Sequence, residues 1–130
     1  MLNKSTICKS SVLKDKKGWI GFSYAFNGIK TVILTERNFQ IHLVCMFLVL
    51  GIGFLLNINR YEWLILLLVI SLVLITEMIN SAIERLIDYL KPEIHPEAKL
   101  IKDIAAGAVL VSAIFAVIIG IIIFLPYLWR

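Results

Sequence analysis

A chain of 130 residues that is 60% hydrophobic, with a mean hydropathy of +0.91, lies far outside the range of soluble globular proteins. These values exclude a water-soluble enzyme or binding module and predict a single domain embedded in a bilayer. The formal net charge is +4, and seven of the 13 Lys and Arg residues precede position 38, so positive charge is concentrated near the N-terminus.

The N-terminal part is polar and basic. Residues 1–17 are rich in Ser, Thr and Lys, which predicts a mobile basic tail beside an anionic membrane surface. From 18 to 35, apolar residues recur every three or four positions, so we expect an amphipathic helix lying in the membrane interface. No cleavable signal peptide is expected, because the first long apolar run begins only near Phe39. Cys8 and Cys45 show no disulfide or metal-site spacing and are assigned no role.

Three apolar segments follow, and each predicts a membrane-spanning helix. The first is 39–58, because about 20 residues at 1.5 Å per residue cover a hydrocarbon core of roughly 30 Å. The second is 63–88, since its purely apolar first part is too short to span alone. After a proline-containing loop at 91–97, the third is 104–129, which is almost uninterrupted hydrocarbon. Residues 18–130 are therefore expected to form one all-α membrane domain.

The positions of Lys and Arg predict the orientation of these spans. Seven precede the first span, four lie from Arg85 to Lys102, and the remaining two are Arg60 and Arg130. Since cytoplasmic loops carry the excess of positive charge, the N-terminus and the second loop should face the cytoplasm. The C-terminus should then lie outside.

The second span carries a stripe of polar side chains. Glu77, Asn80, Glu84 and Asp88 stand at offsets of 0, 3, 7 and 11, which confines them to a sector of about 80° on one helix face. An ionisable group within the hydrocarbon costs about 2.5 to 3.5 kcal/mol near the centre, so such groups face a partner, water or a metal ion. The stripe therefore predicts a functional site at the cytoplasmic membrane edge.

Two interpretations of the stripe remain open. In one, Arg85, Lys102 and neighbouring chains neutralise the acids and hold the helices together. In the other, a divalent cation relieves the repulsion between the carboxylates. Mg²⁺ typically takes one or two carboxylates together with nucleotide phosphates, so this interpretation indicates phosphate chemistry.

Two further polar clusters are expected at the same depth. Glu36-Arg-Asn-Phe-Gln-Ile-His42 lies where the first span enters the membrane. Lys99-Leu-Ile-Lys-Asp103 opens the predicted third helix, where Lys102 could hold a phosphate and the helix N-terminus adds free N–H donors. Each cluster alone is equally consistent with ordinary anchoring at the membrane edge. Their convergence on the acidic stripe favours a binding site.

Two other functional classes are alternatives to a binding site at the stripe. A proton or ion transporter needs polar stations across the whole bilayer, but beyond Asp103 the third span offers only Ser112. A non-catalytic membrane scaffold, in which the acids serve assembly alone, is the other alternative. The sequence has no GxxxxGK[ST], GxGxxG or HRD and DFG motifs, which excludes the soluble nucleotide-binding and kinase folds that carry them.

Taken together, the clusters resemble the prokaryotic diacylglycerol kinase family, and specifically its undecaprenol kinase branch. The matching stretches are Glu36-Arg-Asn-Phe-Gln-Ile-His42, Glu77-Met-Ile-Asn-Ser-Ala-Ile-Glu84 with Asp88, and Lys102-Asp-Ile-Ala-Ala-Gly-Ala-Val-Leu110. The resemblance runs from about Tyr24 to the C-terminus. Ser81 stands where many members have Thr, which is a mild departure.

The resemblance implies a lipid kinase of the bacterial cytoplasmic membrane that assembles as a homotrimer with active sites shared between chains. The activity implied is transfer of the γ-phosphoryl group of ATP, with Mg²⁺, to the hydroxyl of undecaprenol, giving undecaprenyl phosphate. The alternative is a diacylglycerol kinase that makes phosphatidic acid. No nucleic-acid partner is expected.

The resemblance also implies roles for individual residues. Glu77 would be the base that takes the hydroxyl proton, Glu36 and Glu84 would hold Mg²⁺, and Asn80 would support them. The residues implied in nucleotide binding are Lys17, Tyr24, Glu36, Glu84, Glu93, His95, Lys102 and Asp103. The residues implied at the substrate edge or in support are Asn38, His42 and Asp88. His42 replaces an acid of diacylglycerol-specific relatives, which favours the undecaprenol branch, although it could equally be a polar residue facing the bundle.

Overall fold

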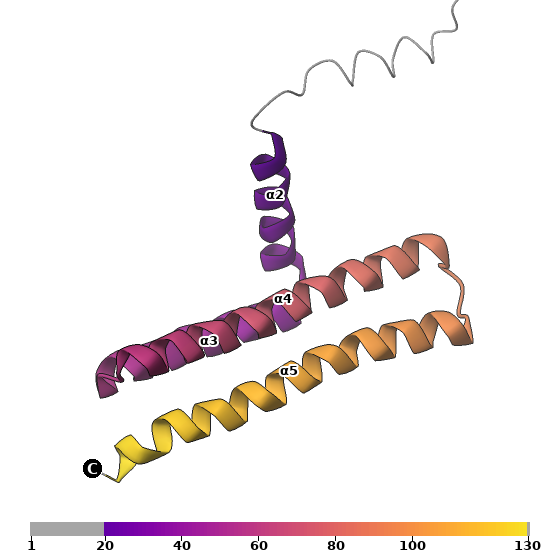
Figure 1. Ribbon diagram of the computed structural model, residues 1–130. Helices are drawn as coiled ribbons and strands as arrows, with labels where there is room; N and C mark the ends of the chain where they lie inside the picture. The colour runs from indigo at the N-terminus through magenta and orange to yellow at the C-terminus, as the bar shows by residue number, and fades with distance from the viewer. Residues whose placement is uncertain (1–19, 130) are drawn as a thin grey trace, which may run out of the picture. The chain divides into compact units, whose positions relative to one another are not determined.

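The computed structural model describes residues 20–129, so the predicted tail at 1–17, including Lys17, lies outside the described residues. The described part is formed by four helices, which confirms the all-α class (Figure 1). They are α2 (Ile20–Thr35), α3 (Arg37–Leu56), α4 (Arg60–Leu90) and α5 (Pro96–Leu128). The chain divides into two compact units, Met1–Thr31 and Val32–Arg130.

The helix predicted at 18–35 is present as α2, while its place at a membrane interface stays a prediction. At Glu36 the backbone leaves the helical conformation, with φ −100° and ψ 107°, so α3 begins as a separate helix at the next residue. The Gln40 side chain donates to the carbonyl of Ile33 at 2.9 Å. This bond satisfies one of the carbonyl groups that the end of α2 leaves without a helical partner.

Three helices are long and apolar enough to cross a membrane, namely α3, α4 and α5. They agree with the predicted spans in number and in approximate position. Because α4 has 31 residues and α5 has 33, both are longer than the ~20 residues that cross the hydrocarbon. Most of their large apolar side chains are exposed in the single chain, as expected for helices that contact lipid or other chains.

The turn between α3 and α4 is short and is held by several hydrogen bonds. Asn57 adopts the left-handed conformation at φ 51° and closes α3. Asn59 then begins α4 with a capping box: its side chain accepts from the N–H groups of Tyr61 and Glu62, and the Glu62 carboxylate accepts from the Asn59 N–H. The second span was predicted from 63, but the Asn-x-x-Glu pattern of this cap starts the helix at Arg60.

The start of α5 corrects another prediction. The helix begins at Pro96, where a proline is favoured because its missing N–H needs no helical partner. His95 caps it, since its Nδ1 accepts from the N–H of Glu97 at 3.2 Å. The prediction that the cluster Lys99-Leu-Ile-Lys-Asp103 opens the third helix is therefore corrected, because α5 begins three residues before Lys99. Lys102 and Asp103 lie within the helix, more than one turn after its start.

Helix α4 packs against both α3 and α5, and it runs alongside α5 for much of its length (Figure 1). A small core lies near the α3–α4 turn, formed by the buried side chains of Ile58, Leu66 and Ile123. Beside it, the hydroxyl of Tyr127 donates to Glu62 at 2.6 Å and ties the end of α5 to the start of α4. This bond holds the two helices together at the end of the hairpin that lies opposite their connecting segment.

Candidate functional site

A cavity of about 280 Å³ lies among α3, α4 and α5 at the level of the acidic stripe. Its polar wall comes from α3 and α4, and its α5 wall is apolar. The lining residues are Asn38, Ile41, His42, Glu77, Asn80, Glu84, Ala106, Val109, Leu110 and Ala113. The predicted convergence of the first-span cluster with the stripe is therefore observed, through Asn38 and His42.

Glu77 and Asn80 are buried at the base of this cavity, with exposed fractions of 3% and 4%. The Asn80 amide nitrogen donates to Glu84 Oε1 at 3.2 Å. Its oxygen, Asn80 Oδ1, is buried without a hydrogen-bond partner in the described part of the chain. An unsatisfied buried acceptor costs about 1–3 kcal/mol, so this oxygen is suited to a ligand that brings a donor or a cation.

The two outer acids of the predicted site are paired with cations. Glu36 Oε1 accepts from Arg85 Nη2 at 2.7 Å and from Arg85 Nε at 3.2 Å. Asp88 forms an ion pair with Lys102, which joins α4 to α5. Of the acids in the stripe, the interpretation that Arg85 and Lys102 neutralise them is confirmed among the described residues for Asp88, whereas Arg85 pairs with Glu36 outside the stripe.

The two inner acids have no such neutralisation. Among the described residues, Glu77 and Glu84 form no ion pair. The Glu77 carboxylate lies close enough to His42, Glu84 and Glu36 to interact electrostatically with all three. Two carboxylates without an ion-pair partner among the described residues, Glu77 and Glu84, therefore line one small cavity. A third, Glu36, lies near Glu77 and is bonded to Arg85.

The donor chemistry of this site suits Mg²⁺. Within residues 20–129, no three His, Cys, Asp or Glu side chains are grouped closely enough to hold a metal ion by themselves. Mg²⁺ in phosphoryl-transfer sites needs only one or two carboxylates, because substrate phosphates and waters complete its octahedral shell. Glu84, Glu77 and the unsatisfied Asn80 Oδ1 provide hard oxygen donors of this kind.

The remaining predicted site residues lie away from the cavity wall. Lys102 reaches α4 at Asp88, and Asp103 forms an exposed ion pair with Lys99 at 3.2 Å. Glu93 and His95 are exposed in the segment that connects α4 to α5. Tyr24 is exposed on α2, in the other compact unit.

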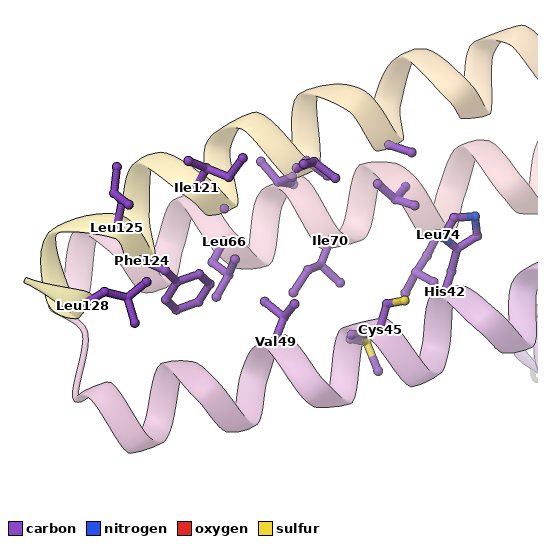
Figure 2. Close-up of a pocket in the computed structure, with 17 residues that line it drawn as sticks. His42, Cys45, Val49, Leu66, Ile70, Leu74, Ile121, Phe124, Leu125 and Leu128 are labelled. Atoms are coloured by element: carbon purple, nitrogen blue, oxygen red, sulfur yellow. The ribbon is translucent and has the colours of Figure 1, made fainter.

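A larger apolar groove of about 560 Å³ lies along the same three helices. Figure 2 shows Val49 of α3, Ile70 of α4 and Phe124 of α5 projecting into it. His42 and Ala113 line both this groove and the carboxylate cavity. The polar cavity and the apolar groove are therefore adjacent, and one ligand with a polar group and an apolar chain would contact both.

Sequence reasoning did not single out the cavity's apolar wall or a hydrogen-bonded pair beside it. Thr76 Oγ1 and Ser112 Oγ are 2.9 Å apart and link α4 to α5 next to Glu77. The sequence could have indicated such a contact, because hydroxyl side chains within an apolar span form hydrogen bonds to neighbouring helices. It does not indicate which residue of the neighbouring helix is the partner.

The fold and site define an α-helical membrane protein with a buried acidic site adjoining an apolar groove. The prokaryotic diacylglycerol kinase family model matches residues 23–124. An undecaprenol kinase of Bacillus subtilis (strain 168) is 45% identical over 107 residues, covering 82% of this chain and 87% of the relative. The chain therefore belongs to the prokaryotic diacylglycerol kinase family, and it is a lipid kinase.

Other relatives are named for a different lipid. A diacylglycerol kinase of Synechocystis sp. (strain ATCC 27184 / PCC 6803 / Kazusa) is 39% identical over 108 residues, covering 82% of this chain and 62% of the relative. A diacylglycerol kinase of Escherichia coli (strain K12) is 32% identical over 95 residues, covering 73% of this chain and 78% of the relative. The family prediction made from the three motifs is thereby confirmed.

Proposed function

We propose that this lipid kinase transfers the γ-phosphoryl group of ATP to the hydroxyl of undecaprenol in a Mg²⁺-dependent reaction. The observation that carries the proposal is the junction at His42 and Ala113, where the acidic cavity meets the apolar groove. An isoprenoid alcohol has the matching form, with one hydroxyl at the end of a long apolar chain. The 45% identity with an undecaprenol kinase supports the same acceptor.

Glu77 is the proposed base. It is buried, lines the cavity and has no ion-pair partner among the described residues, so its carboxylate is available to a substrate hydroxyl. The lipid oxygen forms a bond to the γ-phosphorus as the bond from that phosphorus to the β–γ bridging oxygen breaks. The hydroxyl proton passes to Glu77 and ADP leaves.

Glu84 and Glu36 are the proposed Mg²⁺ ligands, with Asn80 in support. Asn80 donates to Glu84 Oε1 and so orients that carboxylate toward the cavity. The Arg85 bonds to Glu36 all use Oε1, which leaves Oε2 outside them. Bound Mg²⁺ would neutralise charge that develops on the phosphates during transfer.

The nucleotide is proposed to approach from the ends of α4 and α5 that carry the connecting segment. Lys102, Asp103, Glu93 and His95 are the proposed contacts on this side, with Lys17 and Tyr24 from the N-terminal part. Asp88 would hold the Lys102 ammonium in place through their ion pair. A lysine is suited to phosphate contact because it is a compact point charge with three donors.

The proposal extends to assembly and topology. We propose a homotrimer with shared active sites in the bacterial cytoplasmic membrane, with α2 in the cytoplasmic interface and the C-terminus outside. The extensive apolar exposure of α3, α4 and α5 in the single chain supports contact with lipid and with other copies. The excess of Lys and Arg before α3 supports the orientation.

The acceptor is tested by comparing two lipids in one assay. Purified protein in detergent is given MgATP with either undecaprenol or diacylglycerol, and phosphorylated lipid is quantified. We expect faster initial phosphorylation of undecaprenol. Faster phosphorylation of diacylglycerol would assign the chain the activity for which its Synechocystis and Escherichia coli relatives are named. A lack of phosphorylated product with both lipids would contradict the kinase proposal. Full activity without Mg²⁺ would contradict the proposed role of the metal.

A further inference from the structure

Within the described part of the chain, polar side-chain contacts join α4 to α5 at three levels. Lys102 pairs with Asp88 near the connecting segment, and Tyr127 donates to Glu62 near the other end. Between them, the hydroxyls of Thr76 and Ser112 are hydrogen-bonded at 2.9 Å in partly buried, otherwise apolar surroundings. This middle contact lies beside the cavity and has no part in the chemistry proposed above.

The geometry of the pair satisfies both hydroxyl hydrogens. Ser112 Oγ is 2.8 Å from the carbonyl of Val109, and Thr76 Oγ1 is 2.9 Å from the carbonyls of Leu72 and Val73. Each hydroxyl has one hydrogen, so one of them donates across the helices while the other donates to its own backbone. The cross-helix bond is therefore formed without leaving a hydroxyl hydrogen unused.

Apolar contacts alone define the axial register of two membrane helices weakly, because lipid tails are as apolar as the side chains that face them. A directional hydrogen bond in a low-dielectric environment defines it more sharply. Thr76 immediately precedes Glu77, and Ser112 immediately precedes Ala113 of the opposite cavity wall. A shift between Thr76 and Ser112 would therefore shift Glu77 against that wall.

The Glu77 carboxylate itself accepts no hydrogen bond from the described residues. Its position thus depends on where α4 holds its backbone. We propose that the Thr76–Ser112 hydrogen bond is a positioning element that sets the register of α4 against α5 and thereby the position of Glu77 in the cavity. This inference rests on the proposed role of Glu77 as the base.

The first test is kinetic and uses Thr76→Val and Ser112→Ala, which remove one hydroxyl each. We expect kcat to fall about 10-fold with the KM for ATP unchanged, less than the ~100-fold that a 1 Å misplacement can produce. The double variant should lose no more than the single variants, because either substitution already abolishes the bond. Thr76→Ser, which keeps the hydroxyl, should retain kcat.

Ser71→Ala is the matched control. Ser71 lies on the same helix and its hydroxyl donates to the Leu68 carbonyl at 2.7 Å, so this variant removes a hydroxyl that bonds only within α4. It should keep the wild-type kcat. Wild-type kcat in Thr76→Val and Ser112→Ala, or losses that multiply in the double variant, would overturn the proposal.

A second test does not depend on turnover. Thr76→Cys and Ser112→Cys are combined in a chain that also carries Cys8→Ser and Cys45→Ser, and the protein is oxidised by air with copper phenanthroline. We expect a disulfide within one chain, and the oxidised form should have higher kcat than the reduced form. Failure to form it, or links only between chains, would overturn the register assignment. If the cysteine variant forms this disulfide while the wild-type protein is inactive, the proposed function alone is contradicted.

Discussion

Helix α4 carries one glutamate, Glu62, in its first turn and another, Glu77, near its middle, and the two differ in their hydrogen-bond partners. Glu62 accepts from the N–H of Asn59 at 2.8 Å and from the hydroxyl of Tyr127 at 2.6 Å. Glu77 is 3% exposed and accepts no hydrogen bond from the described residues. Both acids occur in the same helix, so residue type and secondary structure do not distinguish their roles.

The difference shows how a structural acid can be told from a candidate catalytic one in a membrane helix. An acid that only holds the fold should be satisfied, because an unpaired buried charge is costly. Glu62 meets that condition through its cap and its bond to α5. Glu77 does not, and the adjacent Asn80 Oδ1 is also without a partner. Unsatisfied groups gathered at one cavity indicate that a ligand completes them.

The most sensitive test of this distinction makes the same Glu→Gln change at both positions. Glu77→Gln keeps the side-chain volume and removes the proposed base, so kcat should fall roughly 10²- to 10⁴-fold, as for loss of general base catalysis. Initial rates of lipid phosphorylation measure this, with the oligomeric state checked by size-exclusion chromatography.

Glu62→Gln, in the first turn of α4, is the matched control. It weakens the cap and the Tyr127 bond but leaves the cavity unchanged, so kcat per folded molecule should stay near wild type. A Glu77→Gln variant with full turnover, or an equal loss of kcat in Glu62→Gln, would remove the distinction between the two acids.

A smaller effect is expected from Asn80→Ala. The substitution removes the donor that orients Glu84, and loss of such an outer-shell partner typically weakens metal binding roughly 10- to 100-fold. The Mg²⁺ concentration for half-maximal activity should rise accordingly, while saturating Mg²⁺ restores much of kcat. An unchanged Mg²⁺ dependence would argue against Glu84 as a metal ligand. Ser71→Ala again serves as the control.

The smallest effect is expected at the start of α4, where Tyr127 contacts Glu62. Tyr127→Phe removes the hydroxyl bonded to Glu62, and hydrogen bonds between membrane helices average about 0.6 kcal/mol, with a maximum near 1.7. The free energy of unfolding, measured by denaturation in mixed micelles, should fall by about 1 kcal/mol. Activity per folded molecule should not change. A large loss of kcat without loss of stability would show that this end also serves catalysis.

Much of the architecture could be predicted because it depends on local properties. Hydropathy over about 20 residues identified α3, α4 and α5, and the helical period brought Glu77, Asn80 and Glu84 to one face. The beginning of α5 was misjudged because the prolines were interpreted as a loop through 97, whereas Pro96 is the first helical residue behind the His95 cap.

The pairing of the acids could not be predicted in the same way. Arg85 and Glu36 are 49 positions apart, and Glu62 and Tyr127 are 65 apart. Whether such groups meet depends on how each helix is rotated and which helix lies next to it. Asp88 illustrates this. It lies on the same helical face as the rest of the stripe, but it forms an ion pair with Lys102 and does not line the cavity.

Hydropathy, helical periodicity and short motifs were enough to predict the class of the protein, the three spans, the acidic stripe and the family, because each is encoded in residues that are close together along the chain. Which acids are neutralised, that the cavity adjoins an apolar groove, and that Thr76 contacts Ser112 became known only from the folded helices. These features arise between helices, where a side chain's partner depends on the rotation and register of two distant segments.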